Sequence, residues 1–261
     1  MKLNELIKVF EQMSPSRYAC SWDNVGLLVG RQEQEIEKVV VCLDVTNEVI
    51  EKAIEQKADL IVAHHPVIFS RIKRINDESF LGRKLLSLIE NKIACYAMHT
   101  NFDTMGGMAQ LAERAMELSN TIPLEVVAEE EGQLQGIGRV GTLKQQMTLL
   151  ECAEFVKKVF EIPAVSICGD TKMRVETIAI CPGSGKGMIN EAKKKGAQVL
   201  IAGDFGHHDG IDALDDNFAL IDAGHYGIEH IFIRYMTQYL CEHFPNLSVV
   251  SVDSHCPFTM V

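Results

Sequence analysis

Residues 39–66 have the sequence VVVCLDVTNEVIEKAIEQKADLIVAHHP, and this stretch decides the fold. The continuous apolar runs at 39–43 and 60–63 are typical of short strands that are buried on both faces. Between them an apolar stripe at helical spacing follows Thr46 or Asn47, either of which can cap the helix. Strand, helix and strand in this order predict a βαβ unit.

The same pattern occurs a second time in the chain. Residues 178–181 resemble 39–42, and residues 197–202 resemble 58–63 at the same offset, so the two strands and the crossover length agree together. A further apolar run follows each copy and ends in polar residues. The sequence therefore predicts an α/β fold made of two related α/β lobes.

We assign residues 1–125 to an N-terminal lobe and residues 126–261 to a C-terminal lobe, the two forming one compact unit. The stretch 121–141, rich in Glu and Gly, is interpreted as a linker or as a segment at a lobe edge. In parallel α/β sheets the ligand crevice lies outside the carboxyl ends of the strands. We therefore expect a site in the cleft between the lobes.

Composition narrows the class of protein. The chain has 261 residues, 47% of them hydrophobic, and a formal net charge of −11, so its mean field repels polyanions and nucleic acid is not an expected partner. The N-terminus lacks an apolar export segment, and no apolar run has the length of a membrane helix. Eight scattered cysteines without a C-x-x-C pair fit a reducing compartment, and we expect a cytoplasmic protein.

Candidate metal ligands follow the predicted strands. His64 and His65 stand where the strand at 60–63 stops, and both rings can serve one site if the chain turns at Pro66. Asp103 follows the run at 93–98 and offers a hard oxygen ligand, or alternatively a helix N-cap. His99, four residues earlier, offers an imidazole to the same site, or alternatively orients a ligand, contacts the substrate or moves protons.

His225 and Glu229 follow the apolar run at 218–221 in the second half. If a helix begins at His225, the spacing of four places imidazole and carboxylate on one face. The segment 203–210 contains His208, a second candidate for proton transfer, and is interpreted either as pocket lining or as a solvated loop. The Gly-rich turn at 181–187 favours a tight turn over an anion-binding loop, because it lacks the full P-loop pattern.

Three histidines and two carboxylates are more ligands than one tetrahedral ion uses. The set His64, His65, Asp103, His225 and Glu229 suits a dinuclear centre of two divalent ions that activate a water. Zn, Mn, Fe, Ni and Co all accept mixed nitrogen and oxygen ligands, so the ligand types leave the identity of the metal open.

An ordered set of motifs resembles the Nif-three-like family of dinuclear metal proteins, named after an NGG-interacting factor and also labelled GTP cyclohydrolase 1 type 2. These motifs are residues 22–27, 64–66, 101–103 with 106–107, 183–185, 203–204 with 207–208, and 222–226 with Glu229. The resemblance implies two related α/β lobes, the dinuclear centre at the five ligand positions, and assembly as a homohexamer.

The ligand set and the resemblance together predict a metal-dependent hydrolase. Its expected substrate is a small nucleotide-like molecule, and opening of the GTP ring at a C–N bond is the reaction that the family label suggests. His99 or His208 would move protons. The alternative is a non-enzymatic scaffold that handles metal or mediates interactions, which predicts tight metal binding without turnover.

Overall fold

The computed structural model describes residues 1–259 and contains two compact units. The first unit comprises residues 1–106 and 232–255, and the second comprises residues 107–231 together with the described residues from Cys256 onward. The chain thus leaves the first unit, builds the second, and returns. The predicted division into an N-terminal lobe of residues 1–125 and a C-terminal lobe of residues 126–261 assigned one continuous segment to each lobe, and it stays a prediction.

A five-stranded sheet forms the centre of the first unit, with the strand order β1-β4-β3-β2-β11. Strands β2, β3, β4 and β11 run parallel to their neighbours, whereas β1 runs antiparallel to β4. Their bounds are β1 Gly26–Val29, β2 Lys38–Cys42, β3 Leu60–Ala63, β4 Ala94–Ala97 and β11 Ser248–Ser251.

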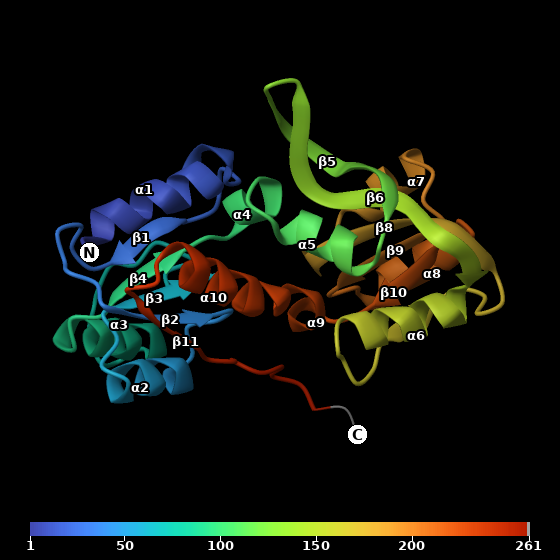
Figure 1. Cartoon of the computed structure of the whole chain (residues 1–261). Coiled ribbons are helices and arrows are strands. Elements are labelled where there is room, and N and C mark those ends of the chain that lie inside the picture. Colours follow the sequence, from blue (N-terminus) through green and yellow to red (C-terminus); the bar gives the residue numbers. More distant parts are fainter. Residues whose placement is uncertain (260–261) are drawn as a thin grey trace. The chain divides into compact units, whose positions relative to one another are not determined.

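Helices cover both faces of the first sheet: α2 and α3 lie on one face, and α1 and α10 on the other (Figure 1). Alternate side chains of a strand point to opposite faces. Val40 therefore packs with Val49 of α2 and Leu88 of α3, while the ring of Tyr96 lies 5.0 Å from that of Phe10 on α1. The helices are α1 Leu3–Met13, the 3-10 helix η1 Ser16–Tyr18, α2 Asn47–Glu55, α3 Phe80–Glu90, α4 Thr100–Thr104 and α10 Ile231–His243.

A six-stranded sheet with the order β5-β6-β8-β9-β10-β7 forms the centre of the second unit. Its middle strands β8, β9 and β10 are parallel, and β5, β6 and β7 are added antiparallel at the two sides. The bounds are β5 Ser119–Glu130, β6 Gln133–Thr148, β7 Ser166–Cys168, β8 Arg174–Ser184, β9 Val199–Gly203 and β10 Ala219–Asp222.

The second sheet also has a packed core on each face. Val156 of α6 belongs to the cluster that contains Ile178 and Ile180 of β8, and Ala213 of α8 belongs to the cluster that contains the alternate residue Ala179. The helices of this unit are α5 Met108–Ala115, α6 Leu149–Val159, α7 Ile189–Lys194, α8 His207–Asp215 and α9 His225–Glu229.

The predicted α/β fold with a repeated strand–helix–strand unit is confirmed. The units β2-α2-β3 and β8-α7-β9 each join two neighbouring parallel strands. The stretch 121–141, for which linker and lobe edge were both considered, belongs to the hairpin of β5 and β6, and β5 is an edge strand of the second sheet.

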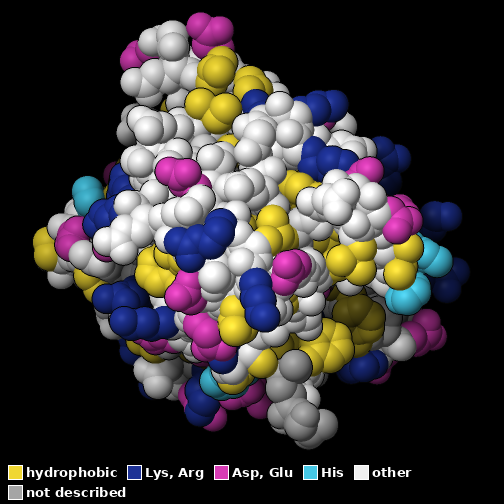
Figure 2. Space-filling view, turned by 90° about the vertical axis from the view of Figure 1, so that its right-hand side faces the viewer, with side chains coloured by type: hydrophobic (Ala, Val, Ile, Leu, Met, Phe, Trp, Pro, Cys, Tyr) yellow, Lys and Arg dark blue, Asp and Glu magenta, His cyan; other side chains and the backbone are white. Residues whose placement is uncertain are grey.

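The helices of residues 1–259 are all too short or too polar to cross a bilayer. In the space-filling view of Figure 2, Lys and Arg side chains alternate with Asp and Glu over the face that is shown. The Lys and Arg side chains form no continuous positive stripe on that face. Binding to the phosphates of duplex DNA would need such a stripe.

Candidate metal centre

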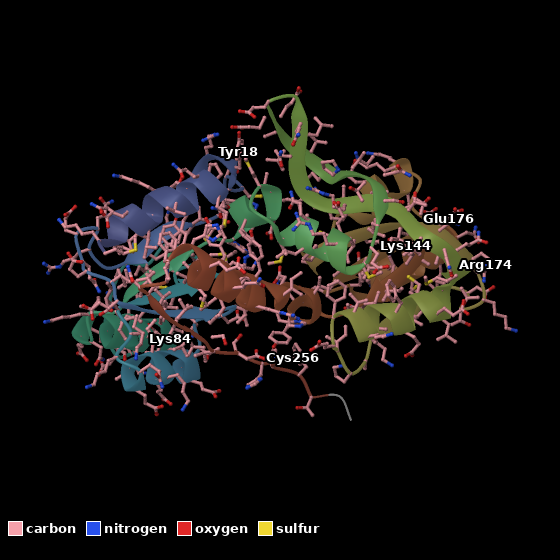
Figure 3. All side chains as sticks on the ribbon, viewed as in Figure 1. Tyr18, Lys84, Lys144, Arg174, Glu176 and Cys256 are labelled. Carbon is pink, nitrogen blue, oxygen red and sulfur yellow. The ribbon has the colours of Figure 1, made fainter. Side chains whose placement is uncertain are left out.

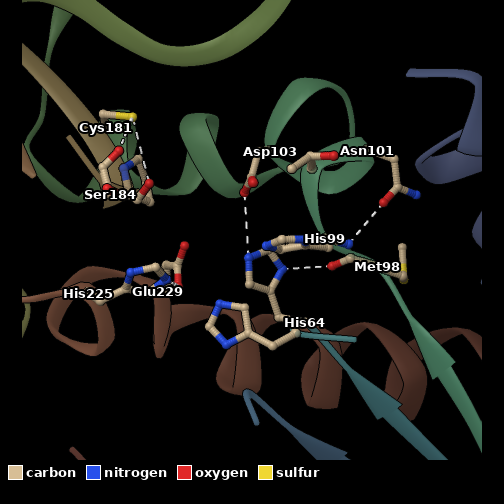
Figure 4. A network of polar contacts seen from close by, with 12 residues as sticks. His64, Met98, His99, Asn101, Asp103, Cys181, Ser184, His225 and Glu229 are labelled. Carbon is tan, nitrogen blue, oxygen red and sulfur yellow. Dashed lines mark hydrogen bonds and ion pairs between the residues drawn. The ribbon is translucent and has the colours of Figure 1, made fainter. Parts of the chain in front are cut away.

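His64 follows strand β3, and the backbone just after the neighbouring strand β4 fixes the tautomer of its ring. The side chain is fully buried, and its Nδ1 lies 2.7 Å from the carbonyl oxygen of Met98 (Figure 4). A carbonyl oxygen only accepts hydrogen bonds, so Nδ1 carries the proton and donates it. The lone pair of Nε2 is therefore available to a metal, and this atom lies 3.6 Å from Oδ1 of Asp103.

His65 lies beside His64, as the predicted turn at the end of the strand requires. The chain bends at these two residues, and the centroids of their rings are 5.0 Å apart. Nδ1 of His65 lies 2.8 Å from Oδ1 of Asp44, which follows β2. A carboxylate at Nδ1 orients the ring and makes Nε2 more basic, an arrangement typical of metal-binding histidines.

Asp44 also interacts electrostatically with Lys84, a lysine on α3. Nζ of Lys84, labelled in Figure 3, donates a hydrogen bond to the carbonyl oxygen of Val45 at 2.7 Å. Partial burial lowers the pKa of Lys84, and the negative charge of Asp44 opposes this shift. The lysine thus ties α3 to the segment that holds the carboxylate partner of His65.

His99 joins the two histidines of the first unit. Its ring centroid lies 5.2 Å from that of His64 and 5.4 Å from that of His65, and one nitrogen of each ring can be chosen so that the three lie within 4.8 Å of one another. Three imidazoles at this spacing could hold a metal ion. For His99 the sequence left open a role as an imidazole ligand and a role in ligand orientation or proton transfer, and the structure places its ring in this cluster.

Asp23 holds the ring of His99. Its buried carboxylate lies 2.9 Å from Nδ1 of His99 and accepts further hydrogen bonds from the backbone and hydroxyl of Thr100. Burial alone would raise the pKa of Asp23, but these hydrogen bonds and the histidine outweigh it and lower the pKa to about 2. Asp23 is therefore ionised at neutral pH, and its carboxylate holds Nδ1 of His99.

Asp103 lies inside the short helix α4. The helix N-cap position is occupied by His99, and α5 is preceded by Gly107, so the alternative interpretation of Asp103 as an N-cap is wrong. Asn101 fixes the turn into α4, because its side-chain oxygen accepts a hydrogen bond from the backbone of His99 and its amide donates to the carbonyl oxygen of Ser14. The side chain of Asp103 is directed at His64 (Figure 4).

In the second unit, His225 and Glu229 lie on one face of α9, as the spacing predicted. Nε2 of His225 lies 3.1 Å from Oε2 of Glu229, and Glu229 is only 3% exposed. Nδ1 of His225 lies 2.7 Å from Oδ2 of Asp204, which follows β9. The helix begins after Gly224, whose positive φ of 72° is readily adopted by glycine.

The Gly-rich turn at residues 181–187 lies against this pair. A Cβ added to Gly183 would lie 2.3 Å from Oε1 of Glu229, so only glycine fits at this point of the chain. Strand β8 continues to Ser184, and helix α7 starts only at Ile189. These bounds favour the interpretation as a tight turn over an anion-binding helix start.

His208 lies at the start of α8 together with His207, and both side chains are exposed. Their rings are 5.3 Å apart. In this segment it is Asp204 that contacts His225, so the structure brings together Asp204, His225 and Glu229 and leaves His208 at the surface.

Three carboxylates with the same role were missed in the sequence: Asp23, Asp44 and Asp204 each contact Nδ1 of a histidine. Asp23 and Asp204 stand within motifs of the family resemblance but were given no role. Asp44 had a usable signal, because it is the first polar residue after the apolar run at 39–43.

Comparisons with known proteins match almost the whole chain. The family model described as Duf34/NIF3 (NGG1p interacting factor 3) matches residues 1–257. The chain belongs to the Duf34/NIF3 family. A Clostridium perfringens protein named "GTP cyclohydrolase 1 type 2 homolog" is 36% identical over 230 residues, which is 88% of this chain and 87% of the relative.

Solved structures of the family share the fold. A Staphylococcus aureus hypothetical protein, SA1388, superimposes with a TM-score of 0.91 at 29% identity, covering 100% of this chain and 99% of that one. A Bacillus cereus protein related to NIF3 gives a TM-score of 0.92 at 25% identity with the same coverage. This Duf34/NIF3 protein thus contains groups of His, Asp and Glu that could bind metal ions on the fold of its relatives.

Proposed function

We propose that this protein is a metal-dependent hydrolase that acts on a C–N bond of a small nucleotide-like substrate. In this proposal His64, His65, Asp103, His225 and Glu229 hold two divalent ions, which are Zn, Mn, Fe, Ni or Co. The name of the relatives, GTP cyclohydrolase 1 type 2 homolog, supports opening of the GTP ring as the reaction.

The observation that carries the proposal is the orientation of the histidine rings. His64, His65 and His225 each have Nδ1 engaged by a carbonyl or a carboxylate oxygen, so each offers Nε2 as the ligand atom. Such partners fix the tautomer and direction of metal-binding imidazoles. Asp103 and Glu229 add oxygen atoms 3.6 and 3.1 Å from Nε2 of His64 and His225, so this donor set fits divalent ions.

Bound ions would activate a water at neutral pH and polarise the substrate. The chain's own contribution to proton transfer is His99, whose Nδ1 is held by Asp23 and whose Nε2 remains for exchange with substrate or water. The ionised Asp23 stabilises the imidazolium after His99 takes up a proton. His208 remains the second candidate for this role.

The resemblance to the family also supports assembly as a homohexamer, which belongs to the proposal. All eight cysteines lie within the described residues 1–259 and are thiols, and four of them are buried. Burial raises the pKa of Cys95 and of Cys152 to about 12, so these thiols are inert. Cysteines in the thiol form support a reducing compartment such as the cytoplasm.

The test combines metal content with turnover. We expect purified protein loaded with divalent metal to release formate from GTP, and we expect Asp103→Ala to lose bound metal and formate release together. Asp77→Ala, an exposed aspartate of the same unit, is the matched control and should keep both. Elemental analysis with an anomalous diffraction scan would identify the ion.

Full activity in Asp103→Ala would refute the assignment of ligands. Tight metal binding without turnover on any nucleotide would instead support the alternative, a scaffold that handles metal.

A further inference from the structure

Two large aromatic side chains stand exposed beside the histidine cluster of the first unit. Trp22 is 58% exposed and Phe69 is 55% exposed, although both belong to residue types that proteins usually bury. Their ring centroids are 5.8 Å apart with an angle of 47° between the planes. The ring of His99 lies 6.0 Å from Trp22 and 6.4 Å from Phe69, so the pair borders the proposed site.

The loops that carry the two rings are fixed by hydrogen bonds. The backbone of Cys20 donates to the hydroxyl of Thr100 at 2.8 Å, and the carboxylate of Asp23 is bound by His99 and Thr100, so the loop is anchored on both sides of Trp22. The side-chain amide of Asn24 donates to the carbonyl oxygen of Ile68 at 2.6 Å and joins this loop to the one that carries Phe69.

An exposed aromatic ring on an anchored loop does not gain the free energy of hydrophobic burial, and its loop does not gain conformational entropy either. Such rings are typical of ligand-stacking surfaces, because every nucleobase has a π-face and stacking on aromatic side chains tolerates different bases. A planar ring stacked on Trp22 or Phe69 would lie next to His99, the residue proposed to move protons.

We propose that Trp22 and Phe69 form a stacking platform for the heteroaromatic ring of the substrate. This inference rests on the proposed function and adds to it the part of the substrate that is recognised in the first unit. The charge of the neighbouring segment fits a nucleotide, since the exposed Arg71, Lys73 and Arg74 follow Phe69 closely in the chain and suit a phosphate chain.

The chain contains a single tryptophan, so intrinsic fluorescence reports on Trp22 alone. The full-length, metal-loaded protein is titrated with guanosine, GTP and inorganic triphosphate, with free N-acetyltryptophanamide as the control for light absorbed by the bases. We expect guanosine and GTP to quench the emission with saturation, and triphosphate, which has no ring, to leave it unchanged.

Variants separate stacking from other contacts. Phe69→Ala, followed by fluorescence, and Trp22→Ala, followed by calorimetry, should each weaken guanosine binding by roughly 5- to 100-fold, as removal of one aromatic partner of a base does. Trp22→Phe keeps an aromatic face and should bind within a few-fold of the natural protein. Phe80→Ala is the matched control, because Phe80 is 68% exposed in the same unit, where its ring faces Lys84 of α3.

Guanosine that fails to quench Trp22, or that binds both alanine variants within twofold of the natural protein, would overturn the platform. Loss of metal binding or absence of formate release, with quenching and the variant effects retained, would overturn the proposed hydrolase and leave the platform standing. The two proposals therefore fail separately.

Discussion

Replacement of Asp23 by Asn tests how strongly the carboxylate is stabilised in the folded protein. The pKa of Asp23 is lowered to about 2, against an ordinary value near 4. One pKa unit corresponds to about 1.4 kcal/mol, so the ionised carboxylate contributes about 2 to 3 kcal/mol to the free energy of unfolding at pH 7. Asp23→Asn should lose about this amount, since the amide keeps the shape but not the charge.

The pH dependence of the loss follows from the sign of the shift. A carboxyl whose folded pKa is lowered stabilises the protein fully above its unfolded pKa near 4, and this stabilisation disappears as the pH falls through about 2. At pH 3 about half of it should remain. The difference between the natural protein and Asp23→Asn should therefore be constant from pH 7 to about pH 5 and then shrink.

Urea unfolding of metal-free protein at pH 7, 5, 4 and 3 measures this difference. The exposed Asp77→Asn is the control, and it should stay within about 0.5 kcal/mol of the natural protein at every pH. A loss below about 0.5 kcal/mol for Asp23→Asn at pH 7, or a loss that does not change between pH 7 and pH 3, would refute the reasoning.

Three further predictions concern the proposed ligands. Gly183→Ala should displace Glu229 and so lower both the melting temperature and the metal content. The control is Gly187→Ala, because Gly187 has a similarly positive φ of 89° but open space around it, so this variant should suffer only backbone strain. Equal effects of the two variants in calorimetry would contradict this prediction. Asp44→Asn should weaken metal affinity by about 10- to 100-fold through the loosened ring of His65, measured by competition with a chelator, and unchanged affinity would exclude that role. Removal of metal with EDTA should lower the melting temperature by about 5 to 10 °C, and an unshifted transition would argue against bound ions in the folded state.

Much of the fold was predictable because the central parallel strands β2, β3 and β9 contain continuous apolar runs. The runs at 39–43 and 60–63 became β2 and β3, since a strand buried on both faces needs apolar residues throughout. The hairpin of β5 and β6 was harder to predict. Its Glu- and Gly-rich sequence and exposed residues such as Val126 and Leu134 lack the alternation that indicates a half-buried strand.

The candidate ligands were predictable for a similar reason. The histidines and carboxylates were noticed because they follow apolar runs that predict buried strands. His225 and Glu229 also had the spacing of residues on one face of a helix. The pairing of His99 with Asp23 was not predictable from spacing, because these residues lie 76 positions apart and only the folded sheet brings them together. The exposed positions of Trp22 and Phe69 likewise depend on tertiary structure.

The return of the chain at Phe232 has a consequence for synthesis on the ribosome. Strand β11 pairs with the edge of β2, so that edge lacks its neighbour until residues 248–251 have left the exit tunnel. During this interval an unpaired strand edge is a template for association with other chains. We therefore expect nascent chains that stall after the second unit has emerged to need a chaperone.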